Sequence, residues 1–298
     1  MRMHPAAPQG LRELVAAFAH TTSAVIDLGR SCTDEDLAQP TDCPGWTVHD
    51  QISHVVGVEA WLEGHKDPRV EMPPYEHIRN DLGKRVEYAV EVRRGRTGAD
   101  VVAELENVLA QRLSTLHSPG LTDSTIIAGP FGPDEAATVV LMRTFDVWVH
   151  EQDIRSALGR PGNLDSPAAA VFVNSVILQL PRLIAKGAAL EPEHEVVIDV
   201  TGPVVARQGV RVEMDGQGRL RGHAMFVGDA DYAASWYVPG EHAQTSDRAP
   251  DWPTTISLST EALTRRAAGR RSVSDTAYNV VGDEAIARRV LEALVVTY

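Results

Sequence analysis

Cysteine is scarce in this 298-residue chain, which contains only Cys32 and Cys43. Two cysteines cannot build the several cross-links of a disulfide scaffold, so the sequence indicates a reducing compartment. Long apolar runs are also lacking, since no segment approaches the roughly 20 apolar residues that cross a bilayer. The N-terminus has no apolar core of a signal peptide either. We therefore expect a cytoplasmic protein that has no membrane partner.

Positive charge is in short supply as well. The chain has 28 Lys and Arg against 41 Asp and Glu, which gives a formal net charge of −13. Binding to phosphate backbones needs clustered Lys and Arg, so this balance argues against a nucleic-acid partner. The 43% hydrophobic and 23% charged content is typical of a globular protein, and the length suits one large domain or two ordinary ones.

The N-terminal half has the periodicity of helices. Apolar residues form a helical stripe over 9–30, and Thr47 with Asp50 resembles a capping box that opens a helix running to about Gly64. Further helical patterns cover the ranges 76–94, 99–117 and 134–158, the last of which stops at a Gly-Arg-Pro-Gly terminator. Long helices with short or moderate connections favour an antiparallel four-helix bundle.

The pattern changes near residue 163. An apolar helix is expected over 166–188, bent at Pro181, and another two helices near 260–268 and from 282 to about 294. Alternating apolar and polar residues predict strands at 194–201, 204–214, 219–227 and 254–258, with a short one closing at Val280. We therefore predict an α+β protein with two domains, a helical bundle over 1–163 and a smaller α/β domain with a largely antiparallel sheet over 164–298.

Three polar residues of the last bundle helix share one face. Asp146, His150 and Asp153 lie at positions i, i+4 and i+7, and a carboxylate and an imidazole one turn apart can hold a metal ion between them. His54, on the helix that Thr47 opens, is a candidate third ligand, because bundles build metal sites from inward side chains of facing helices. Each residue also has an ordinary interpretation, as a core or surface histidine or as a helical side-chain pair. Two histidines and one carboxylate would leave a coordination position open, as catalytic sites do.

Two motifs together resemble the mycothiol-dependent maleylpyruvate isomerase family. They are Cys43–His54 (CPGWTVHDQISH) and Asp146–Arg155 (DVWVHEQDIR). That family belongs to the DinB-like metal-binding four-helix bundles, and Ala267–Arg271 and Val281–Ala285 resemble the end of its sterol-carrier-like C-terminal domain. The resemblance implies a DinB-like bundle over 1–163 and a sterol-carrier-like domain over 164–298.

The resemblance also implies a set of metal ligands. The histidine–carboxylate–histidine triad of the family falls on His54, Asp146 and His150, with Zn²⁺ or another divalent ion as the metal and the thiol of mycothiol at the open position. Asp146 departs from the family pattern, which has a glutamate that is one methylene longer. Beyond the triad, Asp153, Arg155 and Arg143 are also expected to take part in catalysis. Asp153 either accepts a hydrogen bond from a ligand imidazole or forms an exposed charge pair with Arg155.

Three arginines have two interpretations each. Arg143, one turn before Asp146, either pairs with it or faces an acidic substrate. Arg270 and Arg271 are either solvated or bind the anionic cofactor from the second domain. We therefore predict a mycothiol-dependent, metal-activated thiol transferase or cis–trans isomerase that acts on a small electrophile, as a monomer or small homo-oligomer. A metal-dependent hydrolase, with water at the open position, and a non-catalytic carrier with a structural metal stay open.

Overall fold

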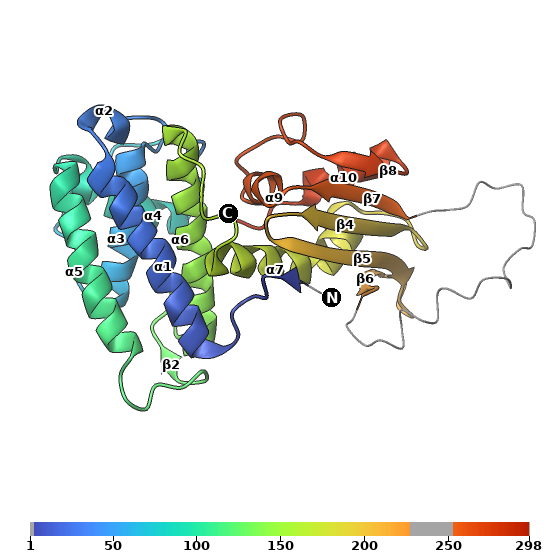
Figure 1. The fold of residues 1–298 in the computed structure, drawn as a ribbon, viewed down its shortest axis with the longest axis horizontal. Helices are drawn as coiled ribbons and strands as arrows, with labels where there is room; N and C mark the ends of the chain where they lie inside the picture. The colour runs from blue at the N-terminus through green and yellow to red at the C-terminus, as the bar shows by residue number, and fades with distance from the viewer. Residues whose placement is uncertain (1–2, 227–252, 298) are drawn as a thin grey trace, which may run out of the picture. The chain divides into compact units, whose positions relative to one another are not determined.

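The computed structural model describes residues 3–226 and 253–297, which fold into two compact units (Figure 1). The helical unit spans Pro8–Val171, and the sheet unit consists of Met1–Ala7 with Phe172–Tyr298. The predicted α+β class, with a helical N-terminal domain and a C-terminal sheet domain, is confirmed. The DinB-like and sterol-carrier-like assignments of the two domains stay predictions.

The two units divide inside a helix, beyond the predicted boundary at residue 163. This helix, α7 (Pro167–Arg182), begins in the helical unit, and Val171 still packs in that unit's core. The start of the chain joins the sheet unit because strand β1 (Met3–His4) pairs with strand β5 (Val205–Met214).

Five long helices form the helical unit, whose residues are all described. They are α1 (Gly10–Ser31), α3 (Val48–Leu62), α4 (Asp81–Arg94), α5 (Gly98–Leu116) and α6 (Ala136–Leu158), accompanied by the short helix α2 (Asp34–Leu37) and the strand pair β2 (Ile126–Ile127) and β3 (Asp134–Glu135). Helices α1, α3, α5 and α6 supply most of the apolar core, whereas α4 packs against α3 and adds no residue to that core. The buried residues of α4 are Glu87, Ala89, Val90 and Arg93, so this helix buries two charged side chains beside two small apolar ones.

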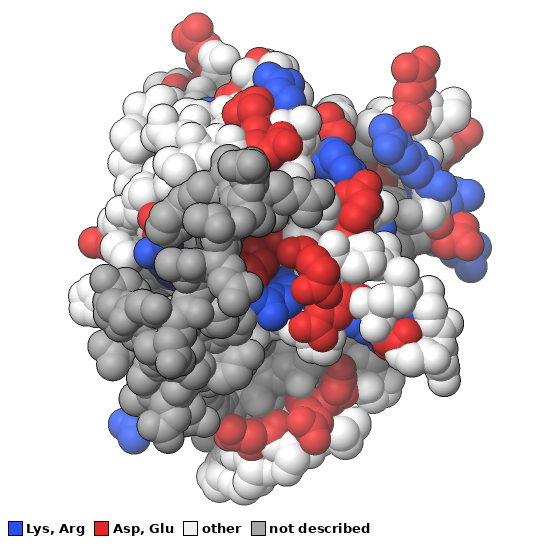
Figure 2. Space-filling model, turned by 90° about the vertical axis from the view of Figure 1, so that its right-hand side faces the viewer, with Lys and Arg blue, Asp and Glu red and all other residues white. Residues whose placement is uncertain are grey.

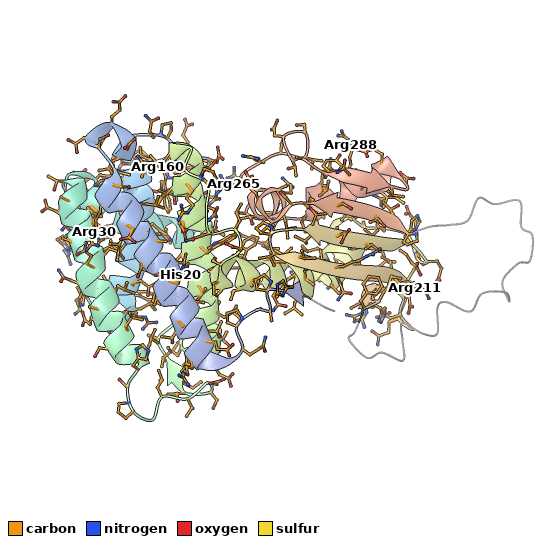
Figure 3. The ribbon with its side chains drawn as sticks, in the orientation of Figure 1. His20, Arg30, Arg160, Arg211, Arg265 and Arg288 are labelled. Carbon is orange, nitrogen blue, oxygen red and sulfur yellow. The ribbon has the colours of Figure 1, made fainter. Side chains whose placement is uncertain are left out.

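Local capping explains where the helices begin and end. The predicted capping box of α3 is confirmed, since Thr47 accepts from the backbone of Asp50 while Asp50 accepts from the backbone of Thr47. Asn80 caps α4, which therefore begins at Asp81, later than the range 76–94 predicts. Helix α6 ends at Gly159, whose left-handed φ of 62° favours glycine. After it, Arg160 donates to Ser31 and Asp36 (Figure 3).

The sheet unit has the strand order β1-β5-β4-β7-β8, and β6 (Leu220–Ala224) pairs with the far half of β5. Its other elements are β4 (Glu195–Thr201), β7 (Thr254–Leu258), β8 (Asn279–Val281), α9 (Thr260–Ala267) and α10 (Glu284–Ala293). Only the pair β4–β7 is parallel among the described strands, so the predicted largely antiparallel sheet is confirmed. The predicted strand 219–227 ends at Ala224, and residue 227 lies outside the described residues.

Several charged side chains on the described surface of the sheet unit form ion pairs. Arg219 and Arg221 both contact Asp215, at 2.9 and 3.1 Å, and Arg211 contacts Glu195. Figure 2 shows acidic and basic side chains next to one another on the described part of one face. Backbone amides and these arginines hold the pKa of the Asp215 carboxyl well below its usual range.

The expectation that no segment is long and apolar enough to cross a bilayer is wrong for one stretch. Pro167–Gly187, which is α7 with the π-helical turn Leu183–Gly187, has a mean hydropathy of 1.6 and suffices by length and composition. The helical path continues past Pro181 into the π-helical turn, so the observed stretch agrees in length with the apolar helix predicted over 166–188. Because 61% of it is buried, the stretch has the character of a core helix.

Candidate metal centre

Helices α3 and α6 pack together and run in opposite directions. Gln51, near the start of α3, contacts His150, whereas Glu59, near its end, contacts Arg143. His54 lies between these two points and therefore faces α6 where Asp146 and His150 protrude. The ligand atoms of these three residues all lie within 4.8 Å of one another.

The carboxylate of Asp146 lies between the two imidazoles. His54 Nε2 is 3.2 Å from Asp146 Oδ2, and His150 Nε2 is 3.6 Å from Asp146 Oδ1. The two rings are 4.4 Å apart between centroids and are almost fully buried. The side chain of Asp146 is 35% exposed, so the centre is reached from solvent at this carboxylate.

The surroundings give the two histidines different proton affinities. Burial, with His150 nearby, lowers the pKa of His54 to about 4, so this imidazole is neutral at neutral pH. Burial also opposes the charged forms of Asp146 and His150, but their mutual attraction outweighs it. With the help of Arg143, the pKa of Asp146 falls well below its usual range, and the pKa of His150 is raised.

These residues fit a divalent metal ion. Two imidazole nitrogens and one carboxylate are a donor set that zinc uses in catalytic sites, with a fourth position left open. His54 supports this, because its buried Nδ1 has no hydrogen-bond partner and its Nε2 has only the carboxylate of Asp146. A buried ring nitrogen without a partner is uncommon in a residue with a purely structural role.

Sequence reasoning missed Gln51, which makes the shortest contact to a candidate ligand. Its Oε1 lies 2.5 Å from His150 Nδ1, while its Nε2 donates to Thr41 Oγ1 at 2.8 Å and lies 3.5 Å from Asp153 Oδ2. A signal was present, because Gln51 precedes His54 by three residues and so shares its helix face. Gln51 fixes the ring of His150 with Nε2 toward Asp146.

The structure places Asp153 beside the centre and Arg155 elsewhere. Asp153 is fully buried and its Oδ2 is 3.6 Å from His150 Nδ1, so its interpretation as part of an exposed charge pair is wrong. Arg155 instead pairs with buried Glu151 at 2.7 Å and donates to the carbonyl of Arg160. Its hydrogen bonds do not run to the three candidate ligands, and a catalytic role for Arg155 stays a prediction.

The other predicted arginines lie in different units. Arg143 is buried and donates from Nη1 to Asp146 Oδ2 at 2.7 Å, which is the pairing that the sequence left open. Arg270 and Arg271 belong to the sheet unit, just after α9. There Arg270 donates to the carbonyl of Ala268, and Arg271 lies 3.5 Å from Glu261. Their role in binding a cofactor stays a prediction.

Trp46 links the candidate centre to α4. Its ring is buried, with its centroid 5.0 Å from the ring of His54 and 5.8 Å from that of His150. Trp46 also donates to buried Glu87, whose carboxylate lies 2.8 Å from Nε2 of the partly exposed His77. These contacts fasten the loop before α3 to α4.

Comparison with known proteins was made for sequence and for fold. Residues 18–155 match the sequence profile of the mycothiol maleylpyruvate isomerase N-terminal domain, and this range contains all three candidate ligands. No curated protein matches the sequence. Two crystal structures have a similar fold, one of a mycothiol-dependent maleylpyruvate isomerase and one of its histidine-to-alanine mutant.

The two crystal structures resemble this chain to nearly the same degree. The first has a TM-score of 0.50 and 15% identity over 91% of this chain and 92% of that chain. The mutant has a TM-score of 0.51 and 15% identity over 90% of this chain and 92% of that chain. At such low identity these likenesses show the fold alone. The resemblance predicted from the sequence motifs is confirmed.

Proposed function

We propose that this chain, whose helical unit belongs to the mycothiol maleylpyruvate isomerase N-terminal domain family, is a mycothiol-dependent enzyme that acts on a small electrophile. The reaction is cis–trans isomerisation or transfer of the thiol. The observation that carries the proposal is the convergence of His54, Asp146 and His150 within 4.8 Å, inside the range that matches the family profile.

These three residues would hold a divalent metal, with Zn²⁺ the best match to two imidazoles and one carboxylate. Such an ion, when bound, lowers the pKa of a coordinated thiol and so supplies a thiolate at neutral pH. Burial keeps His54 neutral, which leaves its lone pair available to a metal. Gln51 keeps the ring of His150 oriented, and Trp46 covers both imidazoles on one side.

The reaction follows from thiol chemistry. The sulfur adds to one carbon of a conjugated double bond, and the resulting single bond rotates. Expulsion of the same thiol then restores the double bond in the other geometry, so no atoms are gained or lost. If the enolate that the addition forms takes up a proton from water before the thiol is expelled, the product is a thioether and the outcome is transfer. The exposed side of Asp146 is where the electrophile would approach.

The location and partners follow the same proposal. The chain has only two cysteines, too few for a disulfide scaffold, and this suits the reducing cytoplasm in which a thiol cofactor works. Mycothiol and a small electrophile are the partners.

The test combines metal loading with a thiol requirement. The purified protein would be loaded with Co²⁺, whose visible spectrum reports its ligands, and titrated with mycothiol. We expect a sulfur-to-metal charge-transfer band, together with turnover of an α,β-unsaturated dicarbonyl compound only when mycothiol is present. Turnover without thiol would identify a hydrolase instead. Metal binding without thiol binding or turnover would favour a carrier with a structural metal.

A further inference from the structure

A chain of buried charges leads away from Asp146 into the helical unit. Arg143 donates to Asp146 Oδ2 at 2.7 Å and, through Nε, to Glu59 Oε1 at 2.6 Å. Arg112 Nε lies 3.3 Å from the other oxygen of Glu59, and Arg112 Nη1 donates to Glu63 at 3.0 Å. The charges alternate in sign along this Glu59 chain, which connects α6, α3 and α5.

The members of the chain are removed from water. The side chain of Glu59 is fully buried, and those of Arg112 and Arg143 are no more than 5% exposed. Ions in such surroundings are stable only when each is paired, so the position of one member constrains the next. Removal of the charge of Glu59 would leave two buried guanidinium groups to compete for the remaining carboxylates.

Arg143 is thereby fixed in two directions. Its Nε is held by Glu59, and this aims Nη1 at one oxygen of Asp146, Oδ2. The other oxygen, Oδ1, faces His150 Nε2 at 3.6 Å and receives no bond from Arg143. The contact with Arg143 therefore selects Oδ1 as the oxygen that is free to bind a metal between the imidazoles.

A purely structural role is the alternative, because buried ion pairs often only specify packing. The helical unit contains such a case in Arg93, which is buried and pairs with Glu104 at 2.6 Å and Asp67 at 3.2 Å. Neither partner of Arg93 contacts a candidate metal ligand. Arg143 differs because it binds a candidate ligand directly, and this pair of cases offers a matched control.

We propose that Glu59 is a positioning residue of the candidate metal centre. By holding Arg143, it orients the carboxylate of Asp146 and sets the charge beside it, although it touches neither metal nor substrate. The inference rests on the proposed metal site and extends it from the three ligands to the residue that arranges one of them.

The first experiment measures metal affinity directly, by competition with a chromophoric chelator. Glu59→Gln should bind Zn²⁺ about 10–100-fold more weakly than the wild type, the usual cost of losing a partner of a ligand. The visible spectrum of the Co²⁺ form should shift as well, because the geometry of Asp146 changes. Glu104→Gln, which removes the charge of one partner of the buried Arg93, should keep the wild-type affinity and spectrum.

A double-mutant cycle tests whether Glu59 acts through Arg143. In an Arg143→Met background, Glu59→Gln should change the Zn²⁺ affinity less than threefold, because the group that it positions is gone. Equal losses in both backgrounds, or an unchanged affinity in Glu59→Gln, would overturn the proposal. If Glu59→Gln does not fold, Glu59→Asp replaces it, with a smaller loss of Zn²⁺ affinity expected because the charge remains.

A wild type that binds metal without mycothiol-dependent turnover would remove the proposed function and leave this inference standing. A wild type that binds no metal would remove both.

Discussion

Two carboxylates of the helical unit invite comparison, the partly exposed Asp146 on α6 and the buried Glu87 on α4. Both helices pack against α3, and both carboxylates have a histidine partner within 3.2 Å. Glu87, however, has one imidazole beside it, and its other partners are Trp46 Nε1 at 2.8 Å and Arg94 Nη2 at 2.6 Å. An indole N–H and a guanidinium donate protons and cannot ligate a metal. Asp146 has two imidazoles with nitrogens directed at it.

The comparison shows that a carboxylate–histidine pair alone does not indicate a metal site. Burial by itself would raise the pKa of Glu87, but hydrogen bonds from His77, Trp46 and Arg94 outweigh it and lower this pKa. Glu87 is thus an ionised carboxylate that binds Trp46 and His77, and it holds the segments before α3 and α4 in place. What distinguishes Asp146 is that a second imidazole reaches it from a facing helix, and the predictions below test this difference.

The largest effect is expected from the imidazoles themselves. His54→Ala and His150→Ala should each abolish stoichiometric Zn²⁺ binding, because two protein ligands hold zinc poorly. His77→Ala removes the imidazole of the Glu87 cluster and should retain full metal content. Elemental analysis of dialysed protein measures the metal, and far-ultraviolet circular dichroism checks the helices. Full metal content in either of the first two variants would remove that residue from the centre.

The Glu87 cluster should respond in stability instead. Glu87→Ala removes one carboxylate partner of Arg94, which keeps Asp50 and Glu91, and leaves the buried Trp46 Nε1 without its acceptor. It should lower the free energy of unfolding by about 1–3 kcal/mol, the cost of an unsatisfied buried donor. Urea unfolding of the metal-free protein measures this loss. Stoichiometric Zn²⁺ binding should persist at temperatures where the variant is folded. If Glu87→Ala were as stable as the wild type but bound no Zn²⁺, Glu87 would belong to the metal centre and would not be a structural residue.

A smaller effect is expected from the residue that orients His150. Gln51→Ala should weaken Zn²⁺ binding by about 10–100-fold, because the imidazole loses the acceptor that fixes it. Asp153→Ala should lower the Zn²⁺ affinity less. Asp153 Oδ2 lies 3.6 Å from His150 Nδ1, whereas Gln51 Oε1 lies 2.5 Å from the same nitrogen. Chelator competition ranks the two variants. The opposite order would make Asp153 the residue that orients the ring, as the sequence suggested.

The smallest effect concerns pH. Asp146 raises the pKa of His150, so a proton occupies this imidazole more readily and competes with a metal. Zn²⁺ affinity should therefore increase with pH, by at most about tenfold per unit for one released proton, and level off above the pKa of His150. In Asp146→Asn the Zn²⁺ affinity should stop increasing at a lower pH, because the charge that raises the pKa of His150 is gone. Glu87→Gln should leave the pH dependence of the Zn²⁺ affinity unchanged. A changed pH dependence in this variant would show that the residues around Glu87 influence the candidate metal centre.

Parts of the fold could be predicted because they depend on neighbours in sequence. The capping box of Thr47, the end of α6 at Gly159 and the shared face of Asp146 and His150 follow from local geometry. Fold class followed from the change of periodicity near residue 163. The apolar helix over 166–188 was predicted nearly to its bounds, and its helical path continues past Pro181, a residue that commonly ends or bends a helix.

The polar contacts around the centre could not be predicted in this way. Gln51 and His150 are 99 residues apart and meet only because α3 and α6 run in opposite directions. Glu59 has the sequence character of an ordinary exposed helix residue, yet it is fully buried between two arginines.

The sequence by itself therefore determined the helices, their ends and the residues that each helix face presents, because these depend on interactions within a few residues. The tertiary structure alone decided which faces meet, which imidazole nitrogen faces Asp146 and which buried charges pair. These depend on packing between helices distant in sequence, where burial forces each polar group to find a partner and no local pattern records which one.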